Sequence, residues 1–204
     1  GRDHTTNGRQ SIAPSVAFGL GSPTRVILQG QFTRQENLPD YGIPGAAWNA
    51  PLAPTTVLAS RPVDQATYYG SPDVDYDHAD QQSLTGRVEH DFGGGWALRN
   101  QTRFNQTSRE AVITAISSIA SFTPATEQVA FARQINVRDN SILSNQTSLV
   151  GRLTTGKVSH AITAGIEVTS EDYSAPGWTG AGTRDPQSIY DPQPFAPVAA
   201  FAPV

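Results

Sequence analysis

Cysteine and methionine are both absent from the 204 residues of this chain, and charged residues are scarce. Without cysteine, the chain can form neither a disulfide framework nor a thiolate metal site. Charged residues make up 16 % of the chain, below the roughly 25 % typical of soluble domains. The formal net charge of −4 argues against a broad nucleic-acid-binding surface. Because a complete gene product begins with methionine, we expect a fragment or a processed chain.

Long apolar runs are also missing. No stretch of about 18 apolar residues occurs, so the sequence predicts no transmembrane helix. The chain does not open on a charged and then apolar signal segment. These absences leave a membrane location open, because a transmembrane strand needs only about 10 residues of alternating polarity.

Six segments do alternate between apolar and polar residues with the period of a β-strand. Short connections that contain glycine, "LGSP", "GGG" and "TTGK", join them in pairs, which predicts three hairpins. The six segments are Ser11–Gly19, Thr24–Arg34, Ser83–Phe92, Trp96–Thr107, Ile142–Leu153 and Val158–Thr169.

The remaining connections are long, and the proline-rich tail, residues 170–204, is expected to hold no strand. An alternation of short turns with very long loops is unusual in compact soluble domains but typical of outer-membrane barrels. Residues 107–122 could form a short helix that begins with a Thr107–Glu110 capping box. Their β-branched residues favour a strand extension above the membrane instead.

The two faces of the predicted strands differ strongly. In the segment that begins at Trp96, Leu98 and Phe104 share one face, whereas Arg99 and Arg103 occupy the other. The apolar faces hold small and medium residues that would pack poorly as a core but suit lipid. Aromatic residues at the turns, such as Phe18, Phe92 and Trp96, suit a membrane girdle. We therefore predict an all-β, antiparallel meander of about six strands, part of a large transmembrane β-barrel.

The tripeptide Asn-Gln-Thr occurs three times, at Asn100, Asn105 and Asn145. It matches the acceptor pattern for N-glycosylation. All three copies lie inside predicted strands, so we interpret them as polar residues of the strand faces.

Three stretches, "IAPSVAFGLGSPTRV", "LPDYGIP" and "VEHDFGGGWALRNQTRFNQTSRE", resemble the TonB-dependent siderophore receptors of Gram-negative outer membranes, and those for catecholate-type siderophores in particular. The resemblance covers roughly residues 8–175. It implies a barrel of about 22 strands blocked by an N-terminal plug. We expect the plug and its TonB-contacting box to lie outside this chain. We expect the whole chain to be a partial barrel, with strands over 11–169 and an extracellular loop over 170–204.

The resemblance implies ferric siderophore uptake, energised by TonB through the plug. For ligand binding we single out Tyr41, Trp48, Tyr68, Tyr69 and Arg103. Flat phenol and indole rings suit a catecholate or hydroxamate chelate, and a guanidinium attracts an anionic one. The alternative is that the aromatic residues pack the loops against one another.

No serine-nucleophile elbow, phosphate-binding loop or spaced metal-ligand set occurs, so we expect no enzyme activity and no protein-bound cofactor. Iron(III) would arrive as the siderophore complex.

The run "DVDYDHAD", Asp73–Asp80, begins like a calcium-binding EF-hand loop but lacks its glycine and final glutamate, which favours an acidic extracellular rim. Outer-membrane lipid is the other expected partner. Alternatives are a lipase-like outer-membrane enzyme and a secreted β-sandwich that binds carbohydrate through Trp48 and Trp178.

Overall fold

A computed structural model describes residues 2–44, 59–117, 122–179, 183–193 and 202–203 of the chain. Six of its strands are hydrogen-bonded side by side in the order β1-β3-β4-β5-β6-β7, while β2 also pairs with β3 and β9 with β6. A second sheet pairs β8 with β10. The strands are β1 (Thr6–Ile12), β2 (Ser15–Phe18), β3 (Thr24–Leu38), β4 (Tyr76–Gly93), β5 (Trp96–Ile116), β6 (Gln128–Thr155), β7 (Val158–Ser174), β8 (Trp178–Thr179), β9 (Thr183–Ser188) and β10 (Ala202–Pro203).

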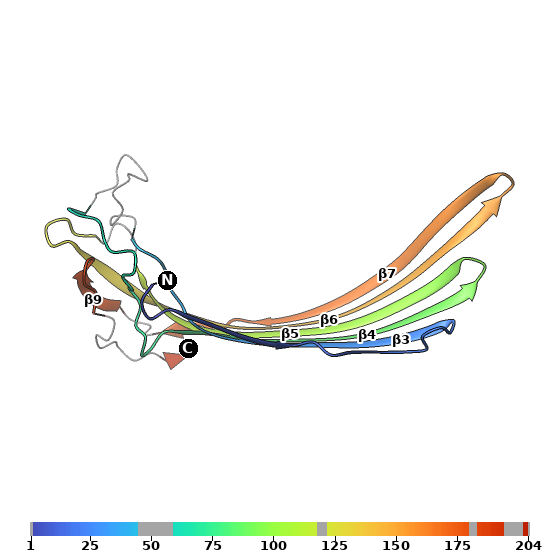
Figure 1. Ribbon diagram of the computed structural model, residues 1–204, viewed down its shortest axis with the longest axis horizontal. Helices are drawn as coiled ribbons and strands as arrows, with labels where there is room; N and C mark the ends of the chain where they lie inside the picture. Colours follow the sequence, from blue (N-terminus) through green and yellow to red (C-terminus); the bar gives the residue numbers. More distant parts are fainter. Residues whose placement is uncertain (1, 45–58, 118–121, 180–182, 194–201, 204) are drawn as a thin grey trace.

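The large sheet is a long, curved ribbon with one concave and one convex side (Figure 1). Tight turns close its strands at one end, and the long loops and both chain ends gather at the other. Antiparallel pairing joins every pair of neighbouring strands in this sheet. The predicted antiparallel meander is therefore confirmed.

At the end of the sheet closed by the tight turns, the strands begin where the sequence predicts. β3, β5 and β7 begin at Thr24, Trp96 and Val158, as the alternation predicts. Glycines with positive φ form the tight turns just before these strands, and Gly93 and Gly156 have φ values of 76° and 63°.

The first predicted segment differs, because the structure interrupts it at Ala13 and Pro14, between β1 and β2. Proline has no N–H to donate to a neighbouring strand. Its carbonyl still accepts the N–H of Gly30 at 2.9 Å, so the chain stays beside β3 across the break.

Toward the loop end of the sheet, the strands run further than the alternation of polarity predicts. β5 continues to Ile116, so as far as that residue the predicted strand extension is confirmed, and not the helix. Residues 118–121 lie outside the described part. The expectation that no strand follows Thr169 is wrong, because β7 reaches Ser174 and β9 pairs with β6. Pro186 lies at the register shift of that pairing, on an edge strand, where a missing N–H is tolerated.

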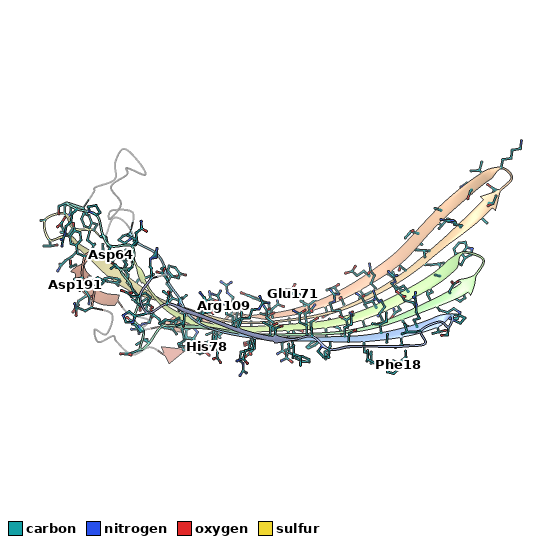
Figure 2. All side chains as sticks on the ribbon, in the orientation of Figure 1. Phe18, Asp64, His78, Arg109, Glu171 and Asp191 are labelled. Atoms are coloured by element: carbon teal, nitrogen blue, oxygen red, sulfur yellow. The ribbon has the colours of Figure 1, made fainter. Side chains whose placement is uncertain are left out.

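The convex side of the sheet carries the apolar residues, and they are exposed. Phe18 is 56 % exposed, Leu28 48 % and Ile166 68 %. Figure 2 shows Phe18 projecting from this convex side. A soluble β-sandwich would bury such residues against a second sheet, so that alternative does not describe this chain. Among the described residues, no helix has the length and apolar content needed to cross a membrane.

A small buried core lies instead at the loop end. Val129 and Phe131 of β6 are fully buried there beneath residues from the loops and from the segment after β9. The core consists of Ala59, Val63, Tyr69, Phe122, Val129, Phe131 and Ile189. It fixes the long connections onto the extended ends of β5 and β6.

Candidate functional site

Charged and polar side chains line the concave side of the sheet. Figure 2 shows Arg109 and Glu171 on this side, opposite to Phe18. Arg99, Arg103 and Arg109 all lie on β5, separated by even numbers of residues. They share this face because side chains alternate along a strand. A column of guanidinium groups therefore runs from near the turns to the loop end.

The lowest arginine belongs to a cluster around Glu89 of β4. The Glu89 carboxylate accepts from Arg99 at 2.7 Å and from Arg25 at 2.8 Å, and Arg87 lies at 3.7 Å. Its side chain is only 13 % exposed. Because three cations share one anion, this part of the concave face has an excess of positive charge.

Arg103 occupies the middle of the column, at a hollow lined mainly by amide and hydroxyl side chains. Its Nε donates to the hydroxyl of Thr85 at 3.2 Å. Among the described residues, no carboxylate lies within ion-pair distance of Arg103. Its charge is thus not neutralised by a carboxylate in the described part of the chain, which suits an anion on the concave side. The hollow also includes Gln29, Gln31, Gln81, Ser83, Asn105 and Thr107.

Arg109 lies nearest the loops and is held by Asp77 of β4. Its Nε and Nη2 donate to the two carboxylate oxygens at 2.8 and 2.9 Å, a forked pair that fixes the plane of the guanidinium. Tyr41 is close enough to act on Arg109 electrostatically, and it is 58 % exposed. The structure thus places one predicted ligand residue, Tyr41, within electrostatic range of an arginine that the sequence analysis did not select.

Tyr68 and Tyr69 are both only 3 % exposed. The hydroxyl of Tyr68 donates to the carbonyl of Pro39 at 3.2 Å, and its ring lies 5.7 Å from that of His4. The hydroxyl of Tyr69 donates to the carbonyl of Ile189, and its ring stacks on Phe131. Burial raises the pKa of the Tyr69 phenol well above its ordinary value. These contacts favour the alternative in which loop aromatics hold the loops together.

Trp48, the remaining aromatic candidate, lies outside the described residues. Direct contact of all five candidates with a ligand stays a prediction.

Sequence reasoning missed Asp75, which is 5 % exposed just before β4. Its carboxylate accepts the N–H of Ser71 at 2.8 Å, and the N–H and hydroxyl of Thr114 at 2.9 and 2.8 Å. Burial raises the pKa of Asp75, while these hydrogen bonds and the nearby Arg133 oppose the rise. Only its place in the acidic run Asp73–Asp80 marks it in the sequence, and neighbouring acids there look the same.

Other acids of that run are also engaged, as Asp77 with Arg109 and Asp80 with Arg34 at 2.9 Å. Over the described part of the chain, no group of three potential metal ligands comes together.

No protein-family model matches the chain. Among characterised proteins, it is 39 % identical over 181 residues to the catecholate siderophore receptor Fiu of Escherichia coli K12, an alignment that covers 84 % of this chain and 24 % of Fiu. It is 26 % identical over 170 residues to PiuA of Acinetobacter baumannii, a probable TonB-dependent siderophore receptor, covering 83 % of this chain and 22 % of PiuA. The chain thus spans about a quarter of the length of these relatives.

Solved structures agree with these alignments. The crystal structure of the ferric-catecholate import receptor Fiu in its open form superposes with a TM-score of 0.86 at 33 % identity, over 100 % of this chain and 32 % of that one. The siderophore receptor PiuA superposes with a TM-score of 0.76 at 22 % identity, over 100 % of this chain and 31 % of that one, which supports the fold alone. The homology and the two-faced sheet together place the chain in the family of TonB-dependent siderophore receptors, with which it shares a segment of the barrel.

Proposed function

We propose that this chain is part of an outer-membrane receptor of a Gram-negative bacterium that takes up ferric siderophores, with catecholate chelates favoured. The similarity to the catecholate siderophore receptor Fiu, 39 % identical over 84 % of this chain, carries the proposal. In the complete receptor, TonB would supply the energy through a plug domain. The convex side would contact outer-membrane lipid.

The concave face supports a ligand of this class. Ferric catecholate complexes are anionic, and the β5 column of Arg99, Arg103 and Arg109 offers positive charge along the lumen. Arg103 is the best placed of the three, because Arg99 and Arg109 each pair with a carboxylate and Arg103 contacts a hydroxyl. An incoming anion would therefore meet an arginine that no carboxylate of the described residues neutralises.

At the loop end, Tyr41 provides an exposed ring close to Arg109, and we propose that these two residues meet the chelate first. A phenol ring can stack on a catechol and also donate a hydrogen bond. Trp48, outside the described residues, remains a proposed ligand residue on its residue type alone. Tyr68 and Tyr69 hold the loops in place from beneath, and a direct contact with ligand would require the loop core to open.

The proposed activity is transport without catalysis. We propose that no cofactor is held by the protein and that iron(III) is present only inside the chelate. The strands from Thr6 to Ser174 would supply part of the barrel wall, and the segment that carries β9 would belong to an extracellular connection. The lipase-like alternative receives no support from the relatives, which are named as receptors.

Uptake of radiolabelled iron tests the proposal. The complete receptor is expressed in a Gram-negative host that lacks its own catecholate receptors, and ferric complexes of a catecholate and of a hydroxamate are supplied. We expect TonB-dependent uptake of the catecholate complex. Arg103→Leu should lower that uptake about tenfold, the effect of one lost charge-assisted contact. Equal uptake of both chelates, or uptake without TonB, would refute the proposal.

Arg34→Leu is the matched control for Arg103→Leu. Arg34 lies on β3 with its side chain on the opposite side of the sheet, where it pairs with Asp80 at 2.9 Å. This substitution removes the same charge outside the lumen, so uptake should stay within about twofold of the unaltered receptor.

A further inference from the structure

Two copies of the tripeptide Asn-Gln-Thr face each other across the β5–β6 pairing. Asn100 is opposite Thr147, Gln101 is opposite Gln146, and Thr102 is opposite Asn145. Because the strands are antiparallel, the same three residues read in opposite directions bring each asparagine opposite a threonine. The two glutamines fall on the concave side, and the asparagines and threonines fall together on the convex side.

This polar group lies in the middle of the apolar band. Asn100 comes four residues after Trp96 and four before Phe104, and all three share one face of β5. Leu149 and Leu143 of β6, opposite Leu98 and Phe104, border the group on both sides. Uncompensated amides at this depth would be costly, because hydrocarbon offers them no hydrogen bonds.

The group compensates itself through four hydrogen bonds. The side-chain amide of Asn100 donates to the Oδ1 of Asn145 at 3.1 Å and to the hydroxyl of Thr147 at 2.7 Å. The amide of Asn145 donates to the Oδ1 of Asn100 at 3.3 Å and to the hydroxyl of Thr102 at 2.7 Å. Each amide thus uses both of its N–H donors within the group. That use of all the amide donors argues against a role for the asparagines as an adhesive surface for another membrane protein, which would need open amide donors.

The β5–β6 pairing is one of the two pairings in the series β3-β4-β5-β6-β7 that no tight turn defines, the other being β3–β4. Tight turns set the register of β4 against β5 and of β6 against β7. β5 and β6 are joined instead by residues 117–127, a connection too long to define one register. Apolar cross-strand pairs in lipid discriminate little between registers that keep the same faces. Side-chain hydrogen bonds do discriminate.

We propose that Asn100, Thr102, Asn145 and Thr147 form a clamp that fixes the register of β5 against β6 inside the membrane. A slip of two residues keeps every side chain on its own face. In one direction the slip leaves Thr102 opposite Leu143, and in the other it leaves Asn100 opposite Leu149. The first slip separates both threonines from the asparagines, although it leaves Asn100 opposite Asn145. The second also places Asn145 opposite Phe104, so both amides then face apolar residues. Either slip breaks the Asn–Thr hydrogen bonds of the clamp.

The clamp has a consequence at the loop end. Thr114, which binds Asp75, and Arg109, which binds Asp77, both lie further along β5. Phe131 of the loop core lies on the facing part of β6. A two-residue slip would move these strand ends past each other by roughly 7 Å. The clamp therefore positions the loop core from within the membrane, whatever ligand the receptor takes.

Cross-linking in the complete receptor, freed of any cysteine outside this chain, tests the register directly. The chain itself has no cysteine. Gln101→Cys with Gln146→Cys reports the native register, and Gln101→Cys with Ser144→Cys or Ser148→Cys reports the two slipped registers. All of these positions lie on the concave side and leave the clamp untouched. A short bifunctional thiol reagent is applied to purified outer membranes.

Single and double substitutions of the clamp give opposite expectations. Asn100→Leu removes both hydrogen bonds between Asn100 and Asn145 and leaves Asn145 only its bond to Thr102, so the folded yield should fall about tenfold. Adding Asn145→Leu restores an apolar band, so the yield should recover, but slipped cross-links should appear at roughly the level of the native one. Asn105→Leu is the matched control, since its copy of the tripeptide faces the concave side, opposite Ile142. It should alter neither yield nor register.

Three results would overturn the proposal. One is a double variant that cross-links only in the native register. A second is a single variant that folds as well as Asn105→Leu. The third is loss of a receptor oligomer on native gels in the double variant with the register unchanged, which would make the group a contact surface between proteins.

Discussion

The carboxylate of Asp75 accepts both the backbone N–H and the hydroxyl of Thr114, at 2.9 and 2.8 Å. The first residue lies at the end of a long loop and the second on the extended part of β5. A third bond, from the N–H of Ser71 at 2.8 Å, closes the loop on itself. A single buried side chain thus ties the connection before β4 to the strand that supports it.

Asp75→Ala should detach this loop locally. It leaves two buried backbone N–H groups without an acceptor and removes the anion beside Arg133, a loss of about 2–4 kcal/mol in local stability. Hydrogen–deuterium exchange over residues 59–75 should accelerate accordingly. Asp73→Ala is the control, because Asp73 is exposed in the same acidic run. Similar exchange in both variants would show that the carboxylate does not anchor the loop.

The same carboxylate predicts a pH dependence. Burial raises the pKa of Asp75, so the folded loop binds its proton at a higher pH than the unfolded loop does. The stability linked to that proton is complete below the ordinary carboxyl pKa of about 3.9 and is lost as pH rises through the raised value. Relative to Asp75→Asn, the unaltered loop should therefore gain stability as the pH falls from neutral towards 4. Protease cleavage within residues 59–75 measures it, and a constant difference between the two proteins would contradict it.

Glu89 holds three arginines together on the concave face. Glu89→Gln should leave their positive charges to repel one another. Arg25, Arg87 and Arg99 would keep their charges without the shared anion. Because Arg25 and Arg99 are more than half exposed, solvent screening limits the expected loss to about 1 kcal/mol. The thermal midpoint of unfolding, followed by heat-modifiable gel migration, should fall, and high salt should reduce the fall.

Glu167→Gln provides the comparison. Glu167 is an exposed acid on the concave face of β7, and its carboxylate accepts a long hydrogen bond of 3.4 Å from the hydroxyl of Thr169. Its loss should change the midpoint little. A defect in Glu89→Gln that salt leaves unaltered would argue that packing, and not charge, is what Glu89 provides.

How far the sequence predicts this structure differs between the tight-turn end and the loop end of the sheet. Near the turns, alternating polarity and glycines define strand starts at Thr24, Trp96 and Val158. Above them, the β-branched stretch around Val112 and Ile113 packs under the loops, both faces become buried, and alternation stops indicating where β5 ends. Local pattern cannot show this, because the covering residues come from distant parts of the chain.

The candidate site divides in the same way. Arg103 is correctly assigned to the polar face by its position in β5. The burial of Tyr69 depends on Ile189, 120 residues away, and no local signal carries that contact. Asp75 is likewise distinguished from Asp73 only by Thr114, 39 residues further on. Loop residues are therefore the part of the site that required three-dimensional information.

Trp96 makes the last prediction, because its indole lies over Gly151 on the facing strand. A Cβ added at Gly151 would lie 2.1 Å from the Cε3 of Trp96, so Gly151→Ala must displace the ring. A Cβ at Gly86 would meet only the Cδ2 of Leu28, at an ordinary 3.7 Å. Gly151→Ala should therefore cost about 1–2 kcal/mol, whereas Gly86→Ala should be neutral or slightly stabilising, since alanine loses less backbone entropy. Thermal midpoints of the two variants give the comparison. Trp96→Leu should abolish most of the cost of Gly151→Ala, and additive effects in that double-mutant cycle would show that the indole is not what the glycine accommodates.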